Sequence, residues 1–155
     1  GLGDYTKKLC ASAKVGMHAD LYAPYGRFKR QAKAEREIWI GAGVGISPFI
    51  SWLQDTDVKD FEKATLVYCF NPGRAFPPAD QLQAMATLRG AHFVSNPSGM
   101  ESIAEVLGQA VANTEPHKVH VSFCGPQGLL VKVRQLMISH QIPQQNLHSE
   151  LFDFR

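Results

Sequence analysis

Cysteine is scarce in this sequence, with three residues among 155, and no two of them form a Cys-x-x-Cys pair. An odd number of widely spaced cysteines excludes a disulfide framework and a zinc knuckle, and it is typical of a reducing compartment. The six histidines include no His-x-x-x-His pair. We therefore expect no bound metal.

An excess of charge of one sign is also lacking, because 16 Lys and Arg stand against 14 Asp and Glu. The net charge of +2 is too small to indicate nucleic-acid or membrane-surface binding. Long hydrophobic runs are missing as well. The uncharged stretch at 38–53 contains Gly, Ser and Pro, and it is shorter than the roughly 20 apolar residues of a membrane span. The composition predicts a soluble globular chain.

A signal peptide is absent too, and the chain opens at Gly1 rather than at a methionine. We expect it to be a piece of a longer protein.

The most informative stretch that is present runs from Ile38 to Phe49, where an apolar run leads into Gly41, Gly43 and Gly45. Ser47 and Pro48 follow and are typical of the N-cap and first position of a helix. A strand, a glycine-rich turn and a helix start in that order form a phosphate-binding device, because the helix start presents free N–H groups to an anion. The competing interpretation is a tight turn that binds no ligand.

The spacing of these glycines differs from the common dinucleotide fingerprint Gly-x-Gly-x-x-Gly. Ile46 or Pro48 stands where the third glycine is required. Moreover, no acidic residue ends the second predicted strand, where a ribose would be bound. An ordinary Rossmann dehydrogenase is therefore disfavoured.

From Glu37 onward, short apolar runs alternate with helical patterns, which predicts an α/β fold with a doubly wound, five-stranded parallel sheet of Rossmann-like type. The predicted strands are Ile38–Ile40, Thr65–Phe70, His92–Ser95, Val119–Phe123 and Leu147–Phe152. The predicted helices are Pro48–Leu53, Ala79–Leu88, Ser102–Ala112 and Gly128–Ser139.

The first part of the chain lacks this rhythm. Tyr5–Leu9 and Met17–Tyr22 are predicted as short strands, and a charged segment leads from residue 29 to residue 36. Two strands without a partner sheet are not stable by themselves. We therefore predict that residues 1–34 are the end of a truncated β-barrel and that residues 35–155 form the α/β domain.

Five segments together resemble the ferredoxin–NADP reductase-like flavoproteins, and among them the ferric reductase and NADPH oxidase branch. The segments are Leu2–Leu9, similar to a late barrel strand; Ala23–Phe28, similar to a Gly-Pro-Tyr-Gly-x-Phe turn; Gly41–Pro48; Cys124–Pro126, similar to a Cys-Gly-Pro turn; and Glu150–Phe152. The family's Arg-x-Tyr-Ser flavin segment has no counterpart in this chain. The chain also continues past Phe152, where the family often ends.

The resemblance implies an FAD-dependent NAD(P)H oxidoreductase of which this chain is a fragment, inactive alone. Hydride would pass from NADPH or NADH to an FAD held by the upstream barrel, and single electrons would then reach an iron or haem acceptor. In the favoured branch the acceptor lies in an N-terminal, haem-containing membrane domain, so this module would lie on the cytoplasmic side of the membrane.

The resemblance also assigns site residues. The pyrophosphate would contact Gly41, Gly43, Gly45, Ile46, Ser47 and Pro48, and the nicotinamide would lie near Cys124, Gly125 and Pro126. Glu150 and Phe152 complete the predicted catalytic set, with Phe152 covering the flavin ring, while Tyr25 and Gly26 would line the flavin cleft.

Arg74 is assigned by its chemistry, because it follows the second predicted strand and a guanidinium there suits the 2′-phosphate of NADPH.

Two other functions stay open. One is a nucleotide-sensing module without redox activity. The other is an S-adenosylmethionine-dependent methyltransferase, which also has a glycine-rich first loop. A methyltransferase would need an acidic residue after the second strand, where this chain has Asn71 and Arg74.

Overall fold

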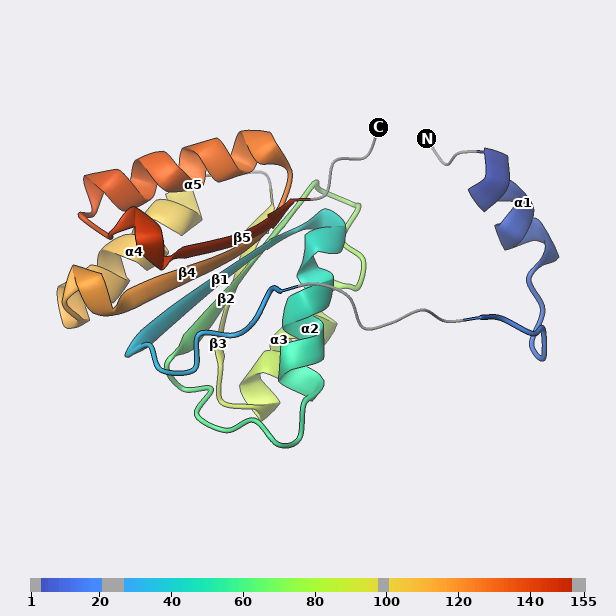
Figure 1. Cartoon of the computed structure of the whole chain (residues 1–155), viewed down its shortest axis with the longest axis horizontal. Helices are drawn as coiled ribbons and strands as arrows, with labels where there is room; N and C mark the ends of the chain where they lie inside the picture. The colour runs from blue at the N-terminus through green and yellow to red at the C-terminus, as the bar shows by residue number, and fades with distance from the viewer. Residues whose placement is uncertain (1–3, 21–26, 98–100, 152–155) are drawn as a thin grey trace.

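A computed structural model describes residues 4–20, 27–97 and 101–151, and its main body is a parallel sheet between two layers of helices (Figure 1). The strands are β1 Arg36–Ala42, β2 Ala64–Phe70, β3 His92–Pro97, β4 Val119–Gly125 and β5 Leu147–Leu151, in the order β3-β2-β1-β4-β5. The five-stranded, doubly wound fold predicted from the sequence is confirmed.

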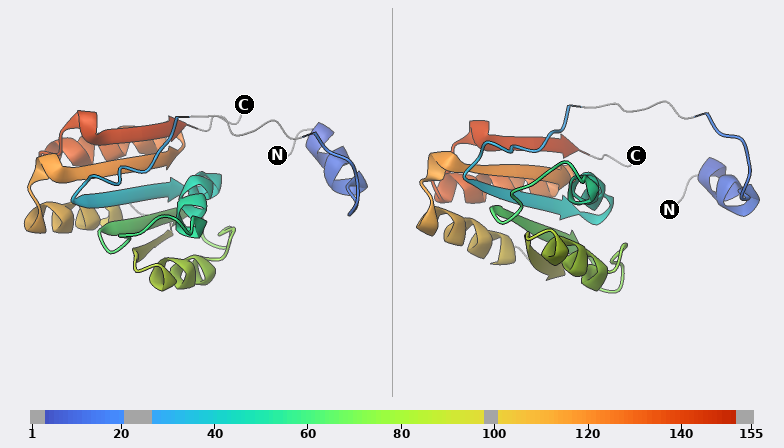
Figure 2. Two further views of the ribbon diagram at one scale, coloured as in Figure 1. Left: turned by 60° about the horizontal axis from the view of Figure 1, so that its bottom comes forward. Right: turned by 90° about the horizontal axis from the view of Figure 1, so that it is seen from below.

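Two pairs of helices cover the two faces of this sheet. Figure 2 shows α2 (Ser47–Gln54) and α3 (Ala79–Leu88) on one face and α4 (Glu101–Asn113) and α5 (Gln127–Ser139) on the other. Short 3-10 turns complete the structure: η1 Gly43–Ile46, η2 Pro116–Lys118 and η3 Gln144–Asn146. Among the described residues, no helix is long and apolar enough to cross a bilayer.

The apolar runs become strands because both sides of each inner strand are buried. In β1, Ile38 and Ile40 pack into the core beneath α4 and α5, whereas Trp39 points to the opposite side. There, the Trp39 ring stacks on Phe49 of α2 at a centroid distance of 6.0 Å. Successive side chains of this apolar segment point to opposite faces of the sheet, so the strand contributes to the core on both faces.

The strand order creates a topological switch point at the carboxyl ends of β1 and β4. From β1 the chain adds β2 and β3 on one side and then returns to add β4 and β5 on the other. β1 and β4 are therefore neighbours, with Gly41 opposite Cys124. Ligands of doubly wound sheets bind at such a switch point, because the flanking loops diverge there.

The prediction of a strand at Tyr5–Leu9 is wrong, because this segment lies in helix α1, Asp4–Ser12. Figure 1 places α1 apart from the sheet, so an extended segment there would have no ladder of hydrogen bonds. A helix satisfies its backbone groups within itself. Residues 17–20 of the second predicted strand are not in a strand either, and residues 21–22 lie outside the described part.

Hydrogen bonds of Arg30 attach the segment before β1, residues 28–35, to the sheet and its loops. Its guanidinium donates to Glu37 at 2.8 Å and to the carbonyls of Lys59 and Asp60 at 2.9 and 2.8 Å. Phe28 of the same segment stacks on Trp52 of α2 at 5.2 Å. Residues 28–30 are thereby packed against the α/β body.

Candidate functional site

The glycine-rich turn lies at the carboxyl end of β1, where it forms the 3-10 turn η1 that runs directly into α2. Gly43 has a φ of +56°, and a side chain there would meet no atom within 4 Å. A left-handed backbone beside open space suits glycine and leaves the turn accessible to a ligand. The first N–H groups of this helical segment have no partner within it, so the turn can bind an anion.

The prediction that Ser47 caps α2 is wrong in detail. Ser47 has helical dihedral angles, and its backbone N–H donates to Val44 rather than being left free. The 3-10 turn η1 runs directly into α2, so helical hydrogen bonding begins before Ser47. The N–H groups available to an anion therefore lie in η1. Ser47 is exposed in the first turn of α2, and Pro48 follows it.

Gly45 has a different role from Gly43, because it lies against the end of β4. A Cβ atom at position 45 would stand 2.1 Å from the carbonyl oxygen of Cys124. A Cβ at Gly125 would likewise be 2.8 Å from the side chain of Ala42, and one at Gly41 would be 2.9 Å from Ile46. The absent side chains let the loop after β1 and the loop after β4 touch.

Cys124 is fully buried at this contact. Burial is the main cause that raises the pKa of its thiol to about 12, and the negative charge of Glu150 is the second. The thiol is therefore neutral near pH 7, so Cys124 does not serve as a thiolate nucleophile. It offers a small, polarisable group beside the glycine-rich turn.

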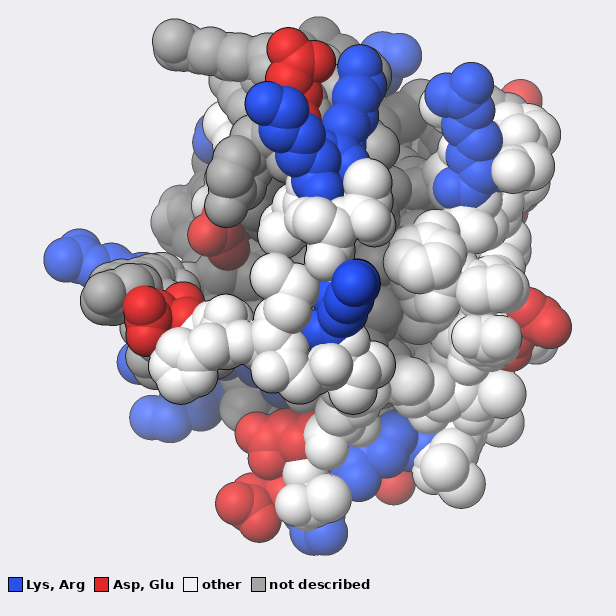
Figure 3. Space-filling model, turned by 90° about the vertical axis from the view of Figure 1, so that its right-hand side faces the viewer, with Lys and Arg blue, Asp and Glu red and all other residues white. Residues whose placement is uncertain are grey.

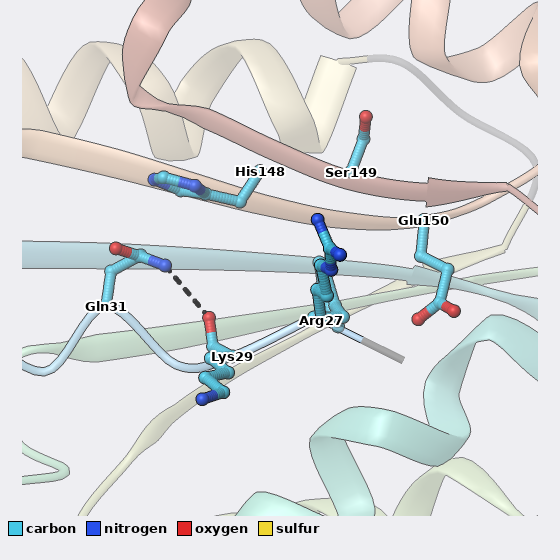
Figure 4. Close-up of a pocket in the computed structure, with 7 residues that line it drawn as sticks. Arg27, Lys29, Gln31, His148, Ser149 and Glu150 are labelled. Carbon is cyan, nitrogen blue, oxygen red and sulfur yellow. Dashed lines mark hydrogen bonds between the residues drawn. The ribbon is translucent and has the colours of Figure 1, made fainter. Parts of the chain in front are cut away.

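Glu150 is the register partner of Cys124 on the neighbouring strand β5. Its half-buried side chain lines a hollow of about 300 Å³ together with Arg27, Lys29 and His148 (Figure 4). The hollow thus combines a carboxylate with two cationic side chains.

The loop after β2 carries two exposed candidates for contact with a nucleotide. Arg74 closes a turn in which its N–H donates to the carbonyl of Asn71 at 2.9 Å, and its side chain is exposed. Phe76 is 85% exposed, and its N–H donates to the hydroxyl of Tyr68 at 3.0 Å. Sequence reasoning missed Phe76 as a site residue, although an aromatic residue after the second strand was a usable signal.

In Figure 3, the Lys, Arg, Asp and Glu side chains of the described residues in view are scattered among uncharged side chains. Across the described residues, no group of three or more His, Cys, Asp or Glu side chains could hold a metal ion.

Known proteins with similar sequences include reductase components of monooxygenases. The chain is 28% identical over 149 residues to the ferredoxin reductase component of the 3-ketosteroid-9-alpha-monooxygenase of Mycobacterium tuberculosis, which covers 93% of this chain and 41% of that protein. It is 27% identical over 139 residues to the carnitine monooxygenase reductase subunit of Escherichia coli, with 90% and 42% covered. No family model matches the chain.

Among solved structures, the FAD/NAD-binding domain of the nitric oxide dioxygenase of Vibrio cholerae has the same fold. Its TM-score is 0.71 at 22% identity, with 97% of this chain and 65% of that domain covered. The chain thus resembles ferredoxin reductase components in sequence and the FAD/NAD-binding domain of a flavoprotein in fold. It spans about two fifths of the length of the curated relatives it matches.

The fold brings most of the predicted residues to one edge of the sheet. At the end of β1 and in the turn and helix start that follow it are Gly41, Gly43, Gly45, Ile46, Ser47 and Pro48. At the end of β4 and directly after it are Cys124, Gly125 and Pro126, and Glu150 lies on the neighbouring strand β5. Arg74 lies on the loop that follows the adjacent strand β2. Tyr25, Gly26 and Phe152 lie outside the described residues.

Proposed function

We propose that this chain is the NAD(P)-binding part of a flavin-dependent oxidoreductase. In that enzyme, hydride passes from NAD(P)H to FAD, and electrons then pass to an iron or haem acceptor. The observation that carries the proposal is the contact of Gly45 with Cys124. This contact places the helix start, which can bind an anion, directly beside the end of β4. A dinucleotide lying across the switch point would therefore touch both segments.

The pyrophosphate would bind at η1. Gly43 leaves room for it, and the free N–H groups of η1 with the positive end of the α2 dipole stabilise negative charge. The exposed hydroxyl of Ser47 can donate a further hydrogen bond. Gly41, Ile46 and Pro48 shape this turn and need not contact the ligand.

The adenosine end would lie over the loop after β2. Arg74 is exposed there and can bind a 2′-phosphate with two charge-assisted hydrogen bonds, which favours NADP over NAD. The exposed ring of Phe76, two residues further along, offers a face on which adenine can stack.

The nicotinamide end would lie beside Cys124, Gly125 and Pro126. The hydride chemistry belongs to the bound nicotinamide and flavin, and the residues of this chain supply position. A neutral thiol at Cys124 allows close approach without attacking the ring, and Glu150 on the next strand can orient the carboxamide. Phe152 is proposed to cover the flavin, with Tyr25 and Gly26 lining its cleft.

FAD would be held by an upstream barrel of which residues 1–34 are the end. The iron or haem acceptor is supported by the relatives, which are named as reductases of monooxygenases. The ferric reductase branch, with its haem-containing membrane domain and a place on the cytoplasmic side of the membrane, rests on the sequence motifs.

A calorimetric titration of the chain with NADP⁺ and with NAD⁺ tests the nucleotide site. We expect Ser47→Glu to weaken binding of both nucleotides at least about tenfold, because a carboxylate at η1 repels the pyrophosphate. The same carboxylate suits a helix start, so the fold is kept. Arg74→Ala should weaken only NADP⁺ binding.

The matched control is Gln54→Glu, which adds the same charge at the exposed far end of α2. It should leave both affinities unchanged. Binding of neither nucleotide to the unaltered chain, or equal loss in the two charge variants, would contradict the proposed site. If Arg74→Ala leaves the ratio of NADP⁺ to NAD⁺ affinity unchanged, Arg74 is not part of the nucleotide site.

A further inference from the structure

A second cavity, of about 350 Å³, lies at the amino-terminal edge of the sheet, away from the nucleotide site. Its walls are the first residues of β1, β2 and β3 and the last two turns of α4. Arg36 opens β1, His92 opens β3, and Thr65 lies beside His92 in the register of β2 and β3. The cavity therefore occupies the edge opposite to η1.

Arg36 is the unusual member of this cavity. Its Nε atom is buried and has no hydrogen-bond partner, and no ion pair of its guanidinium is present among the described residues. Arg89 also has an unpaired Nε, but its Nη2 donates to the carbonyls of Asp55 and Val58. The Nη groups of Arg36 are not among the buried unpaired atoms, so they are the donors of this guanidinium that a bound anion can reach.

The lining of the cavity limits which anion fits. Of its ten lining residues, all described, Arg36 alone carries a permanent charge, and none is Asp or Glu. The side chains of Thr65, Gln109 and Asn113 supply polar groups, whereas Val94, Val106 and Ala110 supply an apolar wall. One cation with an apolar wall suits a single negative charge on a compact apolar body.

We propose that this cavity binds a small monocarboxylate whose apolar part is an aromatic ring or a branched alkyl group. The carboxylate pairs with the two Nη groups of Arg36, because this end of the guanidinium also forms a two-pronged donor that matches two carboxylate oxygens. The apolar body lies on Val94, Val106 and Ala110. The site stands at the far edge from η1 and does not depend on the proposed oxidoreductase function.

The test uses benzoate as the probe, followed by amide NMR spectra of the 155-residue chain and by calorimetry. We expect saturable binding, with the largest shifts at residues 36, 92 and 110. Benzamide has the same shape without the charge and should bind at least about tenfold more weakly. Arg36→Gln should lose benzoate binding to the same degree.

Two further variants keep the result interpretable. Arg134→Gln removes an equally charged but exposed side chain on α5 and should bind benzoate as the unaltered chain does. Arg36→Lys keeps the charge without the two-pronged donor, and should bind more weakly than the unaltered chain. Equal affinity for benzamide, unchanged binding in Arg36→Gln, or shifts confined to residues 43–47 would overturn the proposal.

Discussion

Residue 45 stands where two backbone segments, far apart in the sequence, come into contact. A methyl group at Gly45 would lie 2.1 Å from the Cys124 carbonyl, and both partners are backbone at the switch point, so neither can move aside without disturbing a loop. We expect Gly45→Ala to lower the free energy of unfolding by at least about 1–3 kcal/mol, as overpacking does. Urea unfolding measures this change.

Gly128 provides the control for that prediction. It lies in the first turn of α5, and a methyl group there would meet nothing within 4 Å. Since alanine has the higher helix propensity, Gly128→Ala should leave stability unchanged or raise it by up to about 1 kcal/mol. Equal effects of the two substitutions would show that the contact with Cys124 is not what requires glycine at position 45.

At the scale of elements, the segment that precedes β1 is held by a buried ion pair. The side chains of Arg30 and Glu37 are 7% and 1% exposed, and the indole N–H of Trp39 also donates to Glu37 at 3.1 Å. Arg30→Met would keep the packing on Phe61 but remove the cation that is hydrogen-bonded to the buried Glu37 carboxylate, which would then face Lys63 Nζ at 3.9 Å. We expect stability in urea to fall by about 3–5 kcal/mol.

Two variants separate charge from packing in this prediction. Arg30→Met combined with Glu37→Gln removes both charges and should regain part of the loss, because the new amide oxygen can still accept from Trp39. Lys118→Met breaks two exposed pairs, with Glu35 at 2.9 Å and with Glu115 at 3.2 Å, and should cost no more than about 1 kcal/mol. A loss in Arg30→Met as small as that of Lys118→Met would argue against this role of Arg30.

At the scale of the whole molecule, two histidines on β4 and β5 make stability depend on pH. His120 Nδ1 and His148 Nε2 are 3.1 Å apart, in rings tilted by only 4°. Burial lowers the pKa of both from the ordinary value of 6.5; His120 lowers that of His148 further, whereas Glu37 opposes the shift of His120. Arg27, Lys29 and Glu150 line the hollow beside His148.

The sign of the pH effect follows from these lowered pKa values. As the pH falls below 6.5, these histidines bind protons in the unfolded chain before they do so in the folded chain. Their contribution to stability is therefore full above pH 6.5 and is lost as the pH falls toward the folded pKa values. Urea unfolding at about pH 7.5 and about pH 5.5 measures the fall. His148→Gln should reduce it, whereas the exposed His117→Gln should not. An unchanged fall in His148→Gln would contradict this prediction.

Local patterns predicted most of this fold. Apolar runs such as Ile38–Ile40 and helical patterns such as Ala79–Leu88 correspond to β1 and α3 because burial of both sheet faces and of one helix side leaves a periodic trace. The exception is Tyr5–Leu9, which has no partner strand and lies in α1. Periodicity indicates which face can be buried, not whether anything covers it.

The sequence by itself determined the succession of strands and helices along the chain, the glycine-rich turn and the cationic loop after β2. Each of these features depends on residues that are close together in the sequence. Only the tertiary structure decided that Gly45 meets Cys124, that Glu150 lies opposite Cys124, and that Nε of Arg36 is buried without a partner. Close approach and desolvation depend on strand register and on which helix covers each residue. Those relations join residues distant in the sequence, and no local pattern records them.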